Sequence, residues 1–203
     1  MPTRIRSILF LGPPGAGKGT QGELVGAIPG LFHHSSGDAF RRLDDSVEPG
    51  KSTRPYMNRG DLVPDDLTIQ VWRADLERCI AAGEFRPDVD LLLLDGIPRD
   101  VAQAELLDKE IEVRGVVHLF TSDEDAFVER LKKRALKEGR SDDANESTIR
   151  NRFEVYKRET QPVLDHYPVE RIHTINALQT HAMVLRDVLS VVGPIHAEVA
   201  AGA

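Results

Sequence analysis

The sequence is poor in cysteine, in aromatic residues and in long apolar runs. Its 203 residues include one cysteine, one tryptophan and 5% aromatic residues. Cys79 alone cannot form an intrachain disulfide or a cysteine zinc cluster, so we expect a buried apolar role for it and no zinc. No apolar stretch approaches the roughly 20 residues that span a bilayer, and the run at residues 8–11 is too short for a signal peptide. We therefore expect no membrane association.

Positively charged residues are also fewer than negatively charged ones. Lysine and arginine total 26 against 33 acidic residues, which gives a net charge of −7 at pH 7. A surface of this sign disfavours binding to nucleic acid polymers and to anionic membranes. Any phosphate group must then be held by arginines gathered at one place. The seven histidines show no spacing typical of a metal site or of a serine–histidine–acid triad, so we expect structural or surface roles for them.

Apolar runs alternate with amphipathic stretches along a chain of single-domain length. This alternation predicts an α/β fold, a doubly wound five-stranded parallel sheet. We expect the tail at 197–203 to fray. The expected strands are residues 5–11, 31–34, 91–94, 115–120 and 171–175, and the expected helices are residues 21–27, 65–82, 101–113, 123–136, 146–166 and 179–192.

Two polar segments interrupt this rhythm. Residues 35–63 are rich in glycine and proline, and residues 133–143 are short and highly charged. Polar loops beside a phosphate site often act as moving lids. We therefore predict one single-domain core, residues 1–203, that carries two mobile lid inserts.

A glycine-rich loop, GPPGAGKGT at residues 12–20, follows the first predicted strand. Glycines let backbone N–H groups close on phosphate oxygens, and the positive end of the following helix favours the anion. Lys18 adds a charge at the β- and γ-phosphates of a nucleotide. Gly19 stands where such loops usually carry the hydroxyl that binds Mg²⁺, and the hydroxyl comes one place later, at Thr20.

The second signal is the stretch LDGIPR at residues 94–99. A carboxylate at a strand end near a phosphate loop is suited to hydrated Mg²⁺, which gives Asp95 the metal role that Gly19 cannot take. Gly96 and Pro98 predict a tight turn that would direct Arg99 into the same cleft.

Arginines supply the third and fourth signals. Arg41 lies one turn into a helix that Asp38 can start, on the side of the cleft. Arg130 and Arg134 share a helix face, and Arg140 follows them. Arg150 and Arg152 lean to opposite faces of the next helix, so the spacing allows only one of them to face the cleft.

The four signals in this order resemble the adenylate kinase family, a group of nucleoside monophosphate kinases, from residue 8 to about residue 192. The short second insert is similar to members with the short ATP lid. The resemblance implies that residues 35–63 close over AMP and that residues 133–143 close over ATP. It implies ATP contacts at Gly15, Ala16, Gly17, Lys18, Gly19, Thr20, Arg130, Arg134 and Gln179. It implies AMP contacts at Ser36, Arg41, Asp61, Leu62, Val63, Gly96, Ile97, Pro98, Arg99, Gln103, Arg140 and Arg152. The implied catalytic cations are Lys18, Arg41, Arg99, Arg134, Arg140 and Arg152, with Mg²⁺ reached by Asp95 through water.

The implied reaction is the reversible conversion of Mg·ATP and AMP into two ADP by a cytoplasmic monomer. Ser36 stands where the family usually has threonine, and Ile97 stands where it usually has an aromatic residue. A UMP/CMP kinase of the same fold is one alternative, although Gln103 and the Ser36 hydroxyl favour adenine. A regulatory module that binds ATP without turnover is another, and the full arginine set argues against it.

Overall fold

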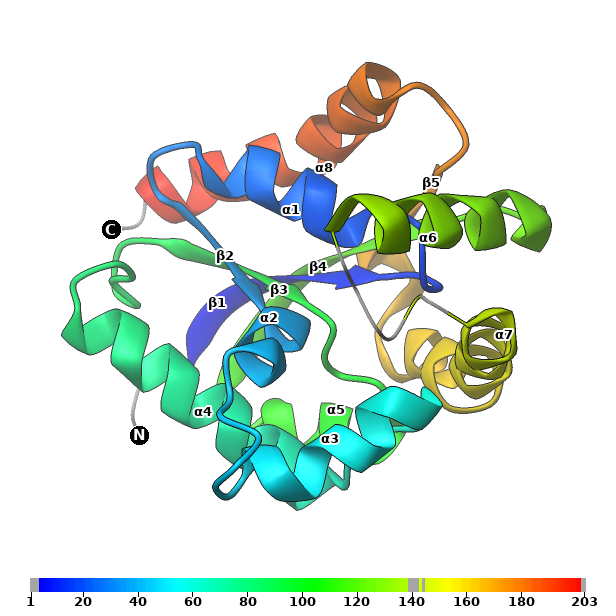
Figure 1. Ribbon diagram of the computed structural model, residues 1–203. Helices are drawn as coiled ribbons and strands as arrows, with labels where there is room; N and C mark the ends of the chain where they lie inside the picture. Colours follow the sequence, from blue (N-terminus) through cyan, green and yellow to red (C-terminus); the bar gives the residue numbers. More distant parts are fainter. Residues whose placement is uncertain (1–3, 139–142, 144, 202–203) are drawn as a thin grey trace.

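The computed structural model describes residues 4–138, 143 and 145–201. A five-stranded parallel sheet lies at its centre, in the strand order β2-β3-β1-β4-β5 (Figure 1). The predicted parallel α/β sheet is therefore confirmed. Its strands are β1 (Ile5–Leu11), β2 (Leu31–Ser35), β3 (Leu91–Asp95), β4 (Ile111–Phe120) and β5 (Ile172–Asn176).

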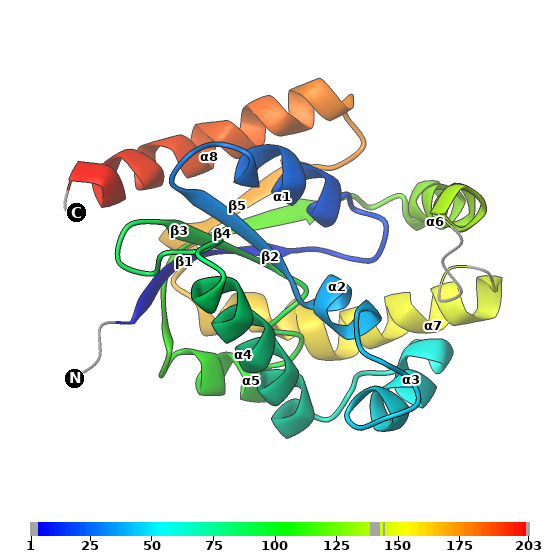
Figure 2. The same cartoon turned by 60° about the vertical axis from the view of Figure 1, so that its left-hand side comes forward.

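Helices cover both faces of this sheet. In Figures 1 and 2, α1 and α8 lie on one face and α4 and α5 on the other, while α3 and α7 flank the edge where the strands end. The bounds are α1 (Lys18–Gly26), α2 (Ser36–Arg41), α3 (Gly50–Arg59), α4 (Asp65–Ala81), α5 (Val101–Leu107), α6 (Glu124–Glu138), α7 (Glu146–Val155) and α8 (His181–Ala201). None of the helices in this described part combines the length and the apolar character needed to cross a membrane.

Strand β3 shows why the sheet is covered on both sides. All five of its residues are buried. Leu91 and Leu93 belong to the apolar cluster under α1 and α8, while Leu92 and Leu94 belong to the cluster that contains Trp72 of α4. A strand that buries both faces needs an unbroken apolar run, and this one has it.

The predicted helix over residues 101–113 is wrong in its second half. Helix α5 ends at Leu107, and β4 begins at Ile111. Ile111 pairs with Ile5 of β1, and its side chain is fully buried, whereas that of Glu112 is half-buried. Pairing with the central strand thus decides the state of a segment whose local pattern also suits a helix.

The chain also differs from prediction near its C-terminus. The segment expected as one helix over 146–166 leaves α-geometry after Val155, continues as a π-turn over Tyr156–Thr160 and ends in a 3-10 turn over Gln161–His166.

Helix α8 continues to Ala201, so the expected fraying is wrong as far as that residue. Val199 explains this difference, because it is buried in the core cluster beneath α1 and α8.

Parallel strands bring their carboxyl ends to one edge, where ligands of such sheets bind. In the sheet register, Phe10 of β1 and Ser35 of β2 both lie beside Asp95 of β3. The glycine-rich loop after β1, the start of α2 after β2 and the turn after β3 therefore meet at this edge.

Helix α1 packs so closely on β2 that one glycine has no room for a side chain. A Cβ atom built on Gly22 would lie 2.3 Å from His33 Nε2. We predict that Gly22→Ala lowers the free energy of unfolding by about 1–3 kcal/mol, because the imidazole of His33 must move to accept the methyl group. Urea unfolding followed by circular dichroism measures this change.

Gly193→Ala in α8 is the matched control. A Cβ atom at Gly193 would meet no atom within 4 Å, so alanine should stabilise the helix by up to about 1 kcal/mol. Equal effects of the two substitutions would contradict the proposed close packing of α1.

Candidate active site

The loop between β1 and α1 is shaped to receive an anion. Gly17 precedes α1 with φ 91°, a left-handed conformation that favours glycine. A Cβ atom on Gly17 would meet no atom within 4 Å, so the loop borders open space. The N–H groups of the first turn of α1 have no partners within the helix, and they suit a phosphate beside this loop.

Lys18 lies over the same loop. Its Nζ atom donates to the carbonyl oxygens of Gly12, at 2.7 Å, and Pro13, at 3.1 Å. Burial lowers the pKa of Lys18 to about 8; the charge of Asp95 opposes this shift, and that of Arg99 adds to it. Phosphate oxygens nearby would favour the charged ammonium and raise this pKa again.

Asp95 ends β3 directly beneath the loop, and it is 7% exposed. One of its carboxylate oxygens, Oδ2, lies 3.6 Å from the position of a Cβ atom on Gly19 and 3.8 Å from His33 Nε2. An oxygen donor in this position fits Mg²⁺ that keeps most of its water ligands and also binds phosphate oxygens. Within residues 4–138, 143 and 145–201, no three His, Cys, Asp or Glu side chains cluster as a metal cage.

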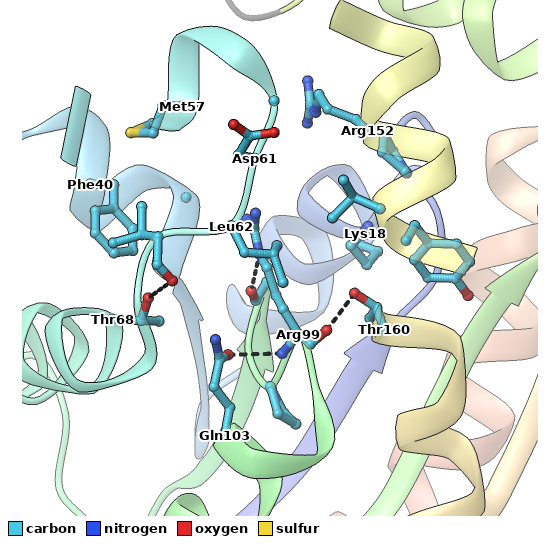
Figure 3. Close-up of a pocket in the computed structure, with 18 of the residues that line it drawn as sticks. Lys18, Phe40, Met57, Asp61, Leu62, Thr68, Arg99, Gln103, Arg152 and Thr160 are labelled. Carbon is cyan, nitrogen blue, oxygen red and sulfur yellow. Dashed lines mark hydrogen bonds between the residues drawn. The ribbon is translucent and has the colours of Figure 1, made fainter. Parts of the chain in front are cut away.

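One cavity lies next to the loop and Asp95, and Figure 3 shows it. Its walls come from the glycine-rich loop, from α2, α3 and the segment after α3, from the turn after β3, and from α7. The predicted site residues on these walls are Lys18, Arg41, Asp61, Leu62, Val63, Gly96, Pro98, Arg99, Gln103 and Arg152. The structure thus brings together side chains from five separate stretches of the chain.

Each arginine on the wall is held by a local oxygen acceptor. Arg41 donates through Nε to the Asp38 carboxylate at 3.2 Å, and Arg99 donates through Nε to the Gly96 carbonyl at 2.7 Å. The hydroxyl of Thr160 donates to the carbonyl oxygen of Arg99 at 2.7 Å, which ties the turn after β3 to the segment that follows α7.

Arg152 and Arg134 share one buried carboxylate. Asp143, whose side chain has no exposed surface, accepts from Arg152 at 2.5 Å and from Arg134 at 2.6 Å. Arg150 instead donates to Glu146 at 2.8 Å, and its side chain is 57% exposed. The structure therefore places Arg152 in the cavity and Arg150 on the outer face of α7.

Comparisons with known proteins match this arrangement. The sequence profile of the family described as adenylate kinase matches residues 10–172. The chain belongs to the adenylate kinase family. It is 43% identical over 166 residues to an adenylate kinase of Corynebacterium urealyticum, across 79% of this chain and 84% of the relative. It is 40% identical over 167 residues to one of Thermus thermophilus, across 80% and 83%, and 36% identical over 181 residues to one of Flavobacterium psychrophilum, across 86% and 91%.

Two residues that the family resemblance assigns to AMP are buried behind the wall. The hydroxyl of Ser36 is buried, and it lies 2.5 Å from the position of a Cβ atom on Gly96, whose φ of 90° also favours glycine. Ile97 is fully buried in the core cluster on the α4 side of the sheet. Only its backbone could therefore face a ligand, and its departure from the family's usual aromatic residue affects the core.

Apart from Lys18, the residues predicted on the ATP side lie outside this cavity. Gly15, Ala16, Gly17, Gly19 and Thr20 form the loop and the start of α1. Arg130 of α6 donates to the carbonyl oxygen of Ala177 at 2.8 Å, and the Gln179 side-chain amide donates to Asp187 at 2.8 Å. Gln179 belongs to the segment between β5 and α8, and the hydrogen bond to Ala177 brings Arg130 beside the same segment.

Part of the predicted ATP lid lies outside the described residues. Residues 133–138 continue α6, and Arg140 lies outside the described residues. All of residues 139–142, together with residue 144, lie outside the described part, so the extent of this lid stays a prediction.

Several wall residues were not among the predicted ones. Tyr156 and Thr160 line the cavity together with Arg152, and Phe40 and Met57 form an apolar part of the wall. The spacing of four from Arg152 to Tyr156 and on to Thr160 was the available signal, because such residues share a helix face. The Tyr156 hydroxyl is hydrogen bonded to the ring of His118 at 3.1 Å. No pattern in the local sequence predicts this contact.

The opposite directions of Arg150 and Arg152 generate a matched pair of substitutions. We predict that Arg152→Ala lowers kcat for phosphoryl transfer from ATP to a nucleoside monophosphate by about 10²–10³-fold, because one cation aimed into the cavity is lost. Arg150→Ala should change kcat by less than about twofold, since exposed ion pairs contribute little. Steady-state assays on both variants measure the effect, and a similar loss in both would contradict the assignment.

Proposed function

We propose that this chain catalyses reversible phosphoryl transfer from Mg·ATP to AMP, which yields two ADP. Family membership supports this proposal, because the relatives from Corynebacterium urealyticum and Thermus thermophilus are adenylate kinases. The observation that carries it is one cavity whose walls hold the phosphate-loop lysine and arginines from three other segments. That arrangement suits a donor phosphate entering from the loop side and a second nucleotide bound against the opposite wall.

The chemistry requires alignment and charge neutralisation more than covalent catalysis. In the proposal, Lys18, Arg41, Arg99, Arg134, Arg140 and Arg152 surround the transferred phosphoryl group and neutralise the charge that spreads over its oxygens. The phosphate of AMP is already a nucleophile at neutral pH, so the reaction needs no general base.

Asp95 would hold Mg²⁺ through bound water, beside the loop that carries the ATP phosphates. The cation, when bound, neutralises phosphate charge and fixes the geometry of the transferred group. The place of Gly19 agrees with this assignment, because it leaves the space in front of Asp95 free of a side chain.

The acceptor side of the cavity offers polar groups around an apolar wall. Gln103 is assigned to AMP, together with the chain at residues 61–63 and the turn at residues 96–99, whereas the Ser36 hydroxyl lies buried behind this wall. Phe40, Met57 and Val63 supply apolar surface there, which suits the flat face of a nucleobase.

The segment at residues 35–63 is proposed as the lid over AMP. It already touches α7, because Asn151 donates to the carbonyl oxygen of Arg59 at 3.0 Å. At Gly60, a Cβ atom would lie 2.7 Å from the Arg152 side chain. Closure of this lid and of the segment at 133–143 would exclude water and so prevent hydrolysis of ATP.

We further propose that the chain acts as a monomer in the cytoplasm. Each residue that the mechanism uses comes from one chain. The single cysteine, Cys79, is unpaired and buried, as expected in a reducing compartment.

An acceptor panel tests the proposed substrate. Mg·ATP is supplied with AMP, CMP, UMP or GMP in turn, and diphosphate formation is followed. We expect AMP to give the highest kcat/KM. A preference for CMP or UMP would assign the chain to pyrimidine nucleotides, and no turnover with any acceptor would favour a module that only binds ATP.

A further inference from the structure

The side-chain amide of Gln103 is enclosed by fixed partners on the cavity wall. Gln103 is 1% exposed. Its Oε1 atom accepts from the backbone N–H of Arg99 at 2.9 Å, as Figure 3 shows, and its Nε2 atom donates to the carboxylate of Asp65 at 2.8 Å. Asp65 opens α4, on a separate stretch of the chain.

These two partners fix which end of the amide is the carbonyl. A backbone N–H can only donate, and a carboxylate oxygen accepts. Turning the Gln103 amide over would set N–H against N–H at Arg99 and oxygen against oxygen at Asp65. Only one orientation therefore satisfies both contacts, and leaving a buried polar group without its partner costs about 1–3 kcal/mol.

The backbone around Gln103 is fixed as well. Its own N–H donates at 2.8 Å to the carboxylate of Asp100, the residue that caps α5. Arg99 is tied to Thr160 through its carbonyl oxygen. The amide is thus held by its side chain and by its main chain before any ligand binds.

After these contacts, one acceptor position on Oε1 and one N–H of Nε2 remain for a ligand. Adenine offers the complement, since its 6-amino group donates and its neighbouring ring nitrogen accepts. Hypoxanthine has an oxygen at position 6, which accepts and would face the carbonyl of Gln103. An amide held in one orientation therefore separates a 6-amino purine from a 6-oxo purine.

We infer that Asp65 is a positioning residue which sets selectivity for 6-amino purine monophosphates by holding the Gln103 amide in this orientation. The inference rests on the proposed function, because that function assigns the base of AMP to this part of the cavity. Asp65 itself contributes only the acceptor that Nε2 requires, and it acts on the base through Gln103.

Titration calorimetry of the full chain with AMP and with inosine monophosphate tests this inference. Asp65→Leu removes the acceptor while keeping a side chain of similar size. Asp65→Asn keeps a carbonyl acceptor and removes the charge, so it is the matched control for charge loss at the start of α4. We expect Asp65→Leu to lower the ratio of the inosine monophosphate Kd to the AMP Kd about tenfold, and Asp65→Asn to keep that ratio within about twofold.

Binding of ATP should be unchanged in both variants, which separates a local effect from general unfolding. Asp65→Ala serves the same purpose if Asp65→Leu does not fold. An unchanged ratio in the leucine and alanine variants, or an equal fall in the asparagine variant, would overturn the inference. If the wild-type chain phosphorylates AMP and the ratio does not respond, the inference fails and the proposed function stands; if the wild type binds neither monophosphate, both fail.

Discussion

The structure depends on the concentration of positive charge at one edge of the sheet in a protein that is acidic overall. Cations that face one cavity repel one another, and each is held in place by an oxygen acceptor. Lys18 is held by loop carbonyls, Arg99 by the Gly96 carbonyl, and Arg152 by Asp143. Phosphates that enter the cavity meet cations whose positions are already set, which is the condition for electrostatic stabilisation of a transition state.

The need to gather positive charge at one edge of the sheet explains why these cations come from separate stretches of the chain. A parallel sheet gathers its strand ends at one edge, so short segments after β1, β2 and β3 meet there without long excursions. The low pKa of Lys18 reflects this crowding of cations at one edge, because burial and neighbouring arginines disfavour the charged ammonium until an anion binds. Residues such as Asp65 belong to this arrangement too, since they fix neutral donors and acceptors around the charged centre.

Signals that are local in the sequence predicted a large part of the fold and of the candidate site. The apolar run at residues 91–94 and the loop at residues 12–20 each specify their own structure, and together they locate the edge where Asp95 lies. The strand start at Ile111 was not predictable in this way, because pairing with β1 decides it. The contact between Gln103 and Asp65, and the bridge that Asp143 makes between two helices, arise only when the chain has folded, so no spacing along the sequence points to them.

The central claim is that the cavity transfers the terminal phosphoryl group of ATP to a second nucleotide. Its most direct test is the fate of a radioactive label in the γ-phosphate of ATP during a single turnover with AMP present. The account predicts that the label appears in ADP, that inorganic phosphate stays at background, and that no transfer occurs when AMP is left out. Release of the label as inorganic phosphate at the same rate with and without AMP would contradict it.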